Sequence, residues 1–270
     1  MSKNQKIWLL IGGLLVICVC VLIGGSVTFF MLQGQTKNTI QQVTNVNPLG
    51  DTTAQDCTLR LTPARSNQIG AVWSSTKKPV QNGFETVFEF QLTELGGAVN
   101  RTDETTGGDG FTFIIQNDTL SFLGENGAGL GYPPVANSLA IEFDTWLNDG
   151  IALGPNLKDP NGNHISIHTR GLEPNDGHED SSIGATIDLP DISDGEIHTV
   201  KIVYIPGTIE IFMDNLATPV LTVPVDLATN LNLDNGQAWV GFTASTGAAW
   251  ENHDILNWTF NGAKVGNDCL

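Results

Sequence analysis

The residues best suited to chemistry lie in one stretch, "SLAIEFDTWLNDGIALGPNLKDPNGNHISIH", which runs from Ser138 to His168. In a strand, side chains two residues apart point to the same face, so Glu142, Asp144 and Trp146 share one side. Carboxylate and amide oxygens suit Ca2+, and adding one imidazole gives a site that also accepts Mn2+. The stretch therefore predicts one or two metal sites, and the alternative is a surface strand with solvated acids. Three more candidate ligands follow on or beside the next loop: Asn148, Asp159 and His164.

The same carboxylates could instead hydrolyse glycosidic bonds, because retaining glycosidases place two carboxyl groups about 5 to 5.5 Å apart. Laminarinase-like sandwich enzymes carry Glu-x-Asp-x-x-Glu, or a variant one residue shorter. Here the residues after Asp144 are Thr145, Trp146 and Leu147, so the third acid is missing. Hydrolysis is the disfavoured alternative.

Strand signals recur along most of the chain and must position these residues. The run "FETVFEFQL" from Phe84 puts Phe84, Phe88, Phe90 and Leu92 on one face and polar side chains on the other, as in a strand buried on one side. Clusters of Gly, Pro, Asn and Asp separate the runs, and no segment has a long helical period. We expect an all-β antiparallel sandwich. Further strands are expected at "GFTFIIQ", "LAIEFDTW", "HISIHT", "HTVKIVYI", "TIEIFMD", "AWVGFTA" and "ILNWTF".

The overall charge argues against nucleic acid as a partner. The 270 residues include 12 Lys and Arg against 29 Asp and Glu, which gives a formal net charge of -17. A polyanion would be repelled, whereas a neutral ligand or a cation would not. The acidic loop "EPNDGHEDSS" from Glu173 is interpreted as solvated rather than as another metal site.

The amino-terminal region predicts a membrane anchor. Residues 7–32 form an uncharged, mainly apolar run, against about 20 residues needed to span a bilayer as a helix. Lys3 and Lys6 precede the run, so the positive-inside rule places residues 1–6 in the cytoplasm. Residues 33–47 read as a polar linker, and the domain that follows would face the cell exterior or a lumen.

Two cysteines lie outside the apolar run. Cys57 and Cys269 stand near the two ends of the outer domain, and in an exported protein such a pair suggests a disulfide. Two free thiols are the alternative.

Several spaced motifs together resemble the legume-lectin, or L-type lectin, family. They begin near Leu49 with "LRLTPARSNQIGAVW" and "VQNGFETVFEFQL" and reach the carboxyl terminus in the family's order. The resemblance implies a concanavalin A-like β-sandwich, or jelly roll, over residues 48–270. The other motifs are "GGDGFTFIIQ", "SLAIEFDTWLN", "DPNGNHISI", "HTVKIVY" with "IEIFMDN", and "VGFTASTG" with "ENHDILNWTF".

The resemblance also implies a pair of metal ions, Ca2+ and, with less support, Mn2+. Matched by motif, Ca2+ would be held by Asp144, the Trp146 carbonyl, Asn148 and Asp159. Mn2+ would be held by Glu142, Asp144, Asp159 and His164. The loop after Asn148 is longer than in many plant members, so Asp149 remains an alternative to Asp159.

The resemblance further implies a sugar pocket above the metal pair. Asp109 matches the family aspartate that accepts hydrogen bonds from sugar hydroxyls and follows a cis peptide bond. Asn148 would bind both calcium and sugar. A backbone N–H of the Gly-rich loop would donate to the sugar, from Gly127, Ala128 or Gly129. Other candidates are Ser245, Thr246 and Trp250 in the loop that tunes sugar choice, and Trp146 or Tyr132 for stacking on the ring.

Together these observations predict a single-pass, membrane-anchored lectin that binds glycans or glycoproteins without catalysing a reaction. The membrane contact would be residues 7–32, and self-association into a homo-oligomer is left open. The alternatives are a glycoside hydrolase of the same fold and a sandwich that has lost sugar binding and serves protein adhesion.

Overall fold

The computed structural model describes residues 22–23, 26–27, 45–55, 58–151 and 154–266. The chain divides into two compact units, Met1–Gln41 and Gln42–Leu270. In the first unit, β1 (Leu22–Ile23) and β2 (Ser26–Val27) pair antiparallel. These four residues, inside the predicted spanning helix 7–32, are extended, and the rest of that helix lies outside the described residues. Across the described parts of the chain, no helix is long and apolar enough to cross a membrane.

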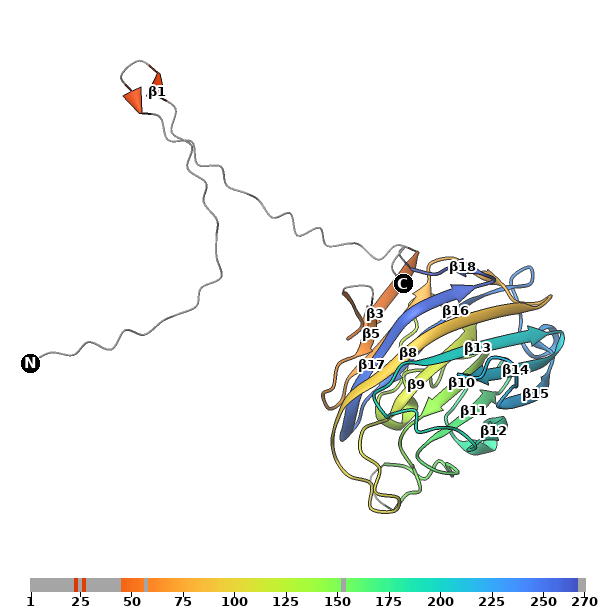
Figure 1. The fold of residues 1–270 in the computed structure, drawn as a ribbon. Helices are drawn as coiled ribbons and strands as arrows, with labels where there is room; N and C mark the ends of the chain where they lie inside the picture. The colour runs from red at the N-terminus through yellow and green to blue at the C-terminus, as the bar shows by residue number, and fades with distance from the viewer. Residues whose placement is uncertain (1–21, 24–25, 28–44, 56–57, 152–153, 267–270) are drawn as a thin grey trace, which may run out of the picture. The chain divides into compact units, whose positions relative to one another are not determined.

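The second unit is a sandwich of two antiparallel sheets that lie face to face (Figure 1). We call the sheet that carries the candidate ligands the front sheet. Strand β7 (Lys78–Pro79) pairs with β16 at its margin. In order across the sheet, its other strands are β12 (Ser182–Thr186), β11 (His164–Thr169), β10 (Ser138–Asp144), β9 (Gly110–Gln116), β16 (Gln237–Ser245), β6 (Ile69–Ser74) and β3 (Val46–Gly50).

The back sheet runs along the other side of the sandwich. Strand β18 (Ala263–Lys264) pairs with β17 at its margin. Its other strands, in order, are β15 (Leu221–Val225), β14 (Gly207–Met213), β13 (His198–Ile205), β8 (Phe84–Gly97), β17 (Ala249–Phe260), β5 (Thr58–Thr62) and β4 (Thr53–Gln55). The helices within the described residues are short: α1 (Leu227–Asn230) and the 3-10 turns η1 (Gly127–Gly129) and η2 (Glu179–Ser181).

The main core lies between the two sheets and is rich in aromatic rings. Phe88 of β8 is fully buried at its centre, 4.9 Å from the ring of Phe242 and 5.8 Å from that of Phe143. Phe111 and Phe113 of β9 also contact it. These rings come from both sheets, so their packing holds the sandwich together.

A second apolar cluster covers the opposite face of the front sheet. The long connection of residues 117–137 packs its Leu130, Tyr132 and Val135 against Trp73 and Ile114 of the sheet. Because both faces are covered, every residue of β9 and β10 is buried. The connection that contains the Gly-rich loop is therefore fixed by its own apolar side chains.

The expected strands are confirmed within a few residues at their ends. In β8, Phe84, Phe88, Phe90 and Leu92 are buried while Glu85 is exposed. The strand signals missed several strands, most of them short or at the sheet edges: β3, β4, β5, β6, β7, β12, β15 and β18. The first sandwich strand begins at Val46, within the expected linker 33–47, and pairs with β6. The expected disulfide of Cys57 and Cys269 lies outside the described residues.

The central position of Phe88 gives a test of this core. Replacing Phe88 by Ala removes a fully buried ring that cannot be replaced by solvent, so the free energy of unfolding should fall by about 3 to 5 kcal/mol. Urea unfolding followed by fluorescence measures this change. The control is Ile205→Ala, whose side chain is 62% exposed and should cost less than about 0.5 kcal/mol. Equal losses in the two variants would contradict this assignment.

Candidate functional site

The pairing of β10 with β11 brings the predicted metal ligands together. Glu142 and Asp144 share one face of β10, and the register sets Asp144 opposite His164. Residues directly opposite in an antiparallel pair have neighbouring side chains. All three side chains are almost completely buried, and one ligand atom from each lies within 4.8 Å of the other two. The alternation expected from the sequence is confirmed here.

His164 presents its Nε2 atom to this cluster. Its Nδ1 atom lies 2.9 Å from the carbonyl oxygen of Asn161, which can only accept, so Nδ1 carries the proton. The Nε2 atom then carries a lone pair when the ring is neutral. It is buried without a hydrogen-bond partner, which is the state of a metal-ligating imidazole.

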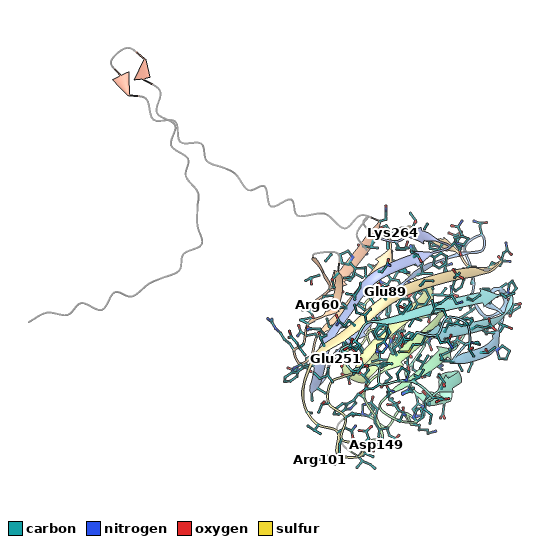
Figure 2. All side chains as sticks on the ribbon, in the orientation of Figure 1. Arg60, Glu89, Arg101, Asp149, Glu251 and Lys264 are labelled. Carbon is teal, nitrogen blue, oxygen red and sulfur yellow. The ribbon has the colours of Figure 1, made fainter. Side chains whose placement is uncertain are left out.

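Asp159 and Asn148 join the cluster from the loop after β10. Oδ2 of Asp159 accepts a hydrogen bond from the Asn148 backbone N–H at 2.6 Å, so the two ends of this long loop meet. A ligand atom of Asp159 also lies within 4.8 Å of His164. Asp149, the alternative to Asp159, instead accepts from Thr102 at 2.6 Å, at the end of the domain where Figure 2 labels Asp149 and Arg101. This geometry favours Asp159 as the ligand.

Two residues of this cluster were missed by sequence reasoning. Glu179, from the acidic loop interpreted as solvated, is only 16% exposed and joins Asp159 and His164 in one group. His168 forms another group with Glu142 and Glu179. His168 follows His164 by four residues in β11. Because an even separation along a strand keeps side chains on one face, the sequence could have predicted that the two histidines share a face. Nothing in the local sequence pointed to Glu179.

The residues present fit a pair of metal ions. Two buried atoms, Oδ1 of Asn148 and Nε2 of His164, have no partner within the described residues, and each is a good ligand. Carboxylate and amide oxygens suit Ca2+, while the imidazole suits a transition metal. The role of the Trp146 carbonyl stays a prediction, although Oδ1 of Asp144 accepts from the Trp146 N–H at 2.8 Å.

A pocket of about 560 Å³ opens beside the cluster. Its lining includes five of the predicted sugar-binding residues, which come from three separate parts of the chain. These are Asp109, Gly127, Ala128, Gly129 and Asn148.

Asp109 is held at this pocket by its backbone. The residue directly precedes β9, its N–H donates to the Ser245 carbonyl at 3.1 Å, and its carbonyl accepts from Thr145 at 3.0 Å. The peptide bond from Gly108 to Asp109 is cis, as the resemblance implied. The carboxylate is buried and its Oδ2 has no partner, so it can accept hydrogen bonds from a ligand in the pocket.

Ser245 and Thr246 do not line the pocket, and their part in sugar binding stays a prediction. Both are fully buried; Ser245 donates to the Gly127 carbonyl at 2.7 Å, and Thr246 accepts from the Gln68 N–H at 2.9 Å. The next three residues, Gly247 to Ala249, line the pocket instead. A β-carbon added to Gly247 would lie 3.0 Å from Oδ2 of Asp109, so a side chain here would crowd this carboxylate.

The aromatic candidates occupy different places: Tyr132 and Trp146 were expected to stack on the ring, and Trp250 to tune sugar choice. Tyr132 is fully buried, and its Oη lies 2.6 Å from Oε1 of Glu142, so it links the Gly-rich loop to the metal cluster. Trp146 does line the pocket, although only 3% of it is exposed. Trp250 packs against Gly96 and Gly97 and is absent from the lining.

A second buried acid lies behind Asp109. Glu251 of β17, labelled in Figure 2, accepts from Thr145 at 2.6 Å and lies 3.3 Å from Nε2 of His253. Neither Glu251 nor His253 is exposed, so this pair has no access to a substrate and supports the wall.

Burial and mutual repulsion raise the pKa values of three of these acids. Burial and the neighbouring Glu251 raise the pKa of Asp109 to about 8. Burial raises the pKa of Asp159 to about 7, although the Asn148 N–H and His164 lower it. Burial, Asp159 and Glu142 raise the pKa of Asp144 well above its usual range. A bound cation would favour the ionised forms of these groups.

The pKa values of two other residues in the cluster, His168 and Glu179, depend on each other. Burial would lower the pKa of His168, but Glu142 and Glu179 raise it to about 10. Burial would raise the pKa of Glu179, but the two nearby imidazoles, His164 and His168, hold it well below its usual range.

These shifts predict how the metal-free protein responds to pH. An unfolded Asp titrates near 3.9, whereas Asp109 and Asp159 in the folded form hold their protons up to about pH 8 and 7. The folded form therefore binds more protons than the unfolded form between about pH 4 and 8, and the free energy of unfolding falls as pH rises. His168 contributes in the same direction above about pH 6.5.

We expect the protein in chelator to lose on the order of a few kcal/mol between pH 5 and pH 8. Urea unfolding at the two pH values measures this. Adding Ca2+ and Mn2+ at pH 8 should restore the loss, because the ions bind the ionised carboxylates. A metal-free protein that is more stable at pH 8 than at pH 5 would contradict the prediction.

Known proteins share this fold. The lumenal domain of VIP36 in its Ca2+-bound form superposes with a TM-score of 0.63 at 17% identity, over 83% of this chain and 86% of that one. Lectin I-B4 from Griffonia simplicifolia gives a TM-score of 0.62 at 21% identity, over 86% and 96%.

The sequence comparisons agree and reach closer relatives. A lectin from Pisum sativum is 28% identical over 77% of this chain and 74% of its own length. A probable L-type lectin-domain containing receptor kinase, S.7 of Arabidopsis thaliana, is 33% identical over 66% of this chain but only 26% of its own length. The family described as the legume lectin beta-barrel domain matches residues 35–258. The chain therefore belongs to the legume, or L-type, lectin family.

Proposed function

We propose that this chain binds carbohydrate in the pocket at Asp109, with Ca2+ organising the pocket and without chemical turnover. One observation carries the proposal: Asp109, Asn148 and the turn Gly127–Gly129 line one pocket, beside a buried cluster of metal ligands. Hydrogen-bond acceptors, amide groups and backbone donors in one shallow place suit the hydroxyl groups of a sugar.

Each pocket group has a separate task. Oδ2 of Asp109 accepts from two sugar hydroxyls, and the amide nitrogen of Asn148 donates. The N–H of Gly129 already donates to Asn126, at 3.3 Å, which favours Gly127 or Ala128 as the backbone donor. Trp146, in the wall, offers an apolar surface to the ring.

The metal ions position these groups. Asp144, Asn148, Asp159 and the Trp146 carbonyl would hold Ca2+, and Glu142, Asp144, Asp159 and His164 would hold Mn2+. Bound there, the ions supply positive charge that offsets the buried carboxylates and fixes the loop of Asn148. One of the VIP36 structures contains Ca2+ and mannose. The structure of another lectin, UEA-II, is a complex with galactose.

The charge of the pocket favours neutral sugars. Asp109, Glu125 and Asp176 line it together with His178, and the lining includes no Lys or Arg. An anionic sugar would be repelled by these acids, whereas a neutral one would not. Each hydrogen bond to the sugar replaces one to water, so affinity at one site is weak, and clustering on a surface raises it through avidity.

Hydrolysis by the strand acids is the weaker alternative. Glu142 and Asp144 are 2% and 3% exposed and do not line the pocket, so they cannot reach a glycosidic bond there. Adhesion to proteins without sugar binding is the remaining alternative, and the binding experiment below decides it.

We further propose that residues 7–32 anchor the chain in a membrane, with residues 1–6 in the cytoplasm and the lectin domain outside the cell or in a lumen. The support is the length of the uncharged run and the two lysines before it.

Replacing Asp109 by Asn tests the binding proposal. Asn keeps the size of the side chain but loses the charge and one acceptor, so binding to glycans should fall at least tenfold, about 1.4 kcal/mol or more. Glycan-array binding in Ca2+, followed by titration calorimetry with the best ligand, measures the change. The matched control is Asp188→Asn, an exposed acid away from the pocket, which should bind like the wild type.

The same experiment is repeated after chelation, and binding should be lost in both the wild type and the control. If the Ca2+-loaded wild type bound nothing on a broad array, the adhesion alternative would replace carbohydrate binding. Release of a shortened sugar product would instead support hydrolysis.

The anchor has its own test. The full chain expressed in cells should remain in the membrane pellet after washing at alkaline pH, because a spanning apolar helix resists extraction. A variant that begins at Gln33 should appear in the supernatant. Extraction of the full chain by the same wash would contradict the anchor.

A further inference from the structure

One short segment takes part in both the pocket and the metal cluster. Asp176, Gly177 and His178 line the pocket, and the next residue, Glu179, begins the turn η2 and extends its carboxylate into the cluster. We call residues 176–179 the bridging segment. An interaction that fixes the position of Glu179 therefore also fixes the part of the pocket wall formed by residues 176–178.

The carboxylate of Glu179 lies between two imidazoles. Its Oε1 atom is 3.5 Å from Nε2 of His164 and 3.5 Å from Nε2 of His168. Both Oε1 of Glu179 and Nε2 of His164 are buried, and neither has a hydrogen-bond partner within the described residues. Two unpartnered ligand atoms that face each other at this separation leave a place for an ion between them.

The other ligands of the same ion surround this place. Ligand atoms of Glu179 and Asp159 lie within 4.8 Å of each other and of His164, and those of Glu142 and Asp144 also lie within 4.8 Å of His164. Octahedral metals accept oxygen ligands together with imidazole. Glu179 is thus positioned to take a coordination place that water would otherwise fill.

The bridging segment also contacts the other two walls of the pocket. The Asp176 carbonyl lies 2.7 Å from Oη of Tyr132, and the Glu179 N–H donates to the Leu157 carbonyl at 2.9 Å. A β-carbon added to Gly177 would lie 3.4 Å from the Ala128 carbonyl and 3.5 Å from Oε1 of Glu142. Movement of the bridging segment would therefore displace its contacts with the Gly-rich loop and with the loop of Asn148.

We propose that Glu179 is a further protein ligand of the imidazole-containing metal site, and that through it the metal fixes the pocket wall at residues 176–178. The consequence for the pocket rests on the proposed carbohydrate function, but the ligand role does not. His168, which lies 3.1 Å from Oε2 of Glu142, is a positioning residue for the two carboxylates.

The competing explanation is that Glu179 only balances the two histidines. The variant Glu179→Gln removes the negative charge under either explanation, so the number of water molecules on the bound ion separates the two roles: it rises only if Glu179 is a ligand. The matched control is Glu173→Gln, an exposed glutamate a few residues earlier in the same loop.

The test measures Mn2+ on the full chain already saturated with Ca2+. Electron paramagnetic resonance of free Mn2+ gives its affinity, and water proton relaxation gives the number of water molecules on the bound ion. For Glu179→Gln we expect affinity to fall at least about tenfold and the bound water count to rise. Glu173→Gln should match the wild type. Unchanged affinity and water count in Glu179→Gln would overturn the proposal.

Hydrogen exchange followed by mass spectrometry tests the link to the pocket wall. Mn2+ should slow exchange at residues 176–181 in the wild type and in Glu173→Gln, and should have little effect there in Glu179→Gln. Equal protection in all three proteins would overturn the link. Far-UV circular dichroism and Ca2+ affinity show that each variant is folded, and Glu179→Asp, whose shorter side chain cannot reach as far, replaces Glu179→Gln if it is not.

The outcomes for this inference and for carbohydrate binding are separate. Loss of Mn2+ affinity in Glu179→Gln, together with a wild type that binds no glycan, would support the ligand role and overturn the proposed function. Wild-type Mn2+ behaviour in Glu179→Gln with strong glycan binding would do the reverse.

Discussion

Mutual repulsion among buried carboxyl groups is the constraint on which the rest of the site depends. Asp109, Asp144 and Asp159 converge where β9 begins and β10 ends, and burial, which is partial for Asp159, deprives them of the water that would normally solvate their charge. Among the described residues, no Lys or Arg lines the adjoining pocket. Such a cluster stays uncharged only by holding protons, and it becomes a stable set of anions when cations enter. The position of the loop of Asn148 therefore depends on how that charge is offset.

Two of the segments that line the pocket depend on this charge to different degrees. The connection 117–137 is fixed mainly by its own apolar side chains against the outer face of the front sheet. The loop between Asn148 and Asp159 is held by a hydrogen bond from the Asn148 N–H to Asp159, one of the proposed metal ligands. Loss of the ions should therefore loosen the second wall while the first keeps its place, since apolar packing does not depend on charge.

The fold and much of the site could be predicted from the sequence because strands encode their faces locally. Alternation of side chains along a strand shows which residues share a face, as in the run from Phe84 and in the pair Glu142 and Asp144. Loop residues carry no such period: Ser245 and Thr246 belong to the right loop, but their side chains point behind the wall. Glu179 was missed for a related reason, since its place in the cluster comes from the path of a loop and not from any pattern.

The lining of the pocket has a consequence for how new ligand choices arise. Two neighbouring turns of the lining, Gly127 to Gly129 and Gly247 to Ala249, present mostly main chain to a ligand. Main-chain amides are chemically the same whatever residue a point mutation introduces, and larger side chains here would fill the space. Changes in selectivity in such a protein must therefore come chiefly from insertions and deletions that move the backbone. Loop lengthening costs little entropy, so evolution can reshape this surface and leave the sandwich unaltered.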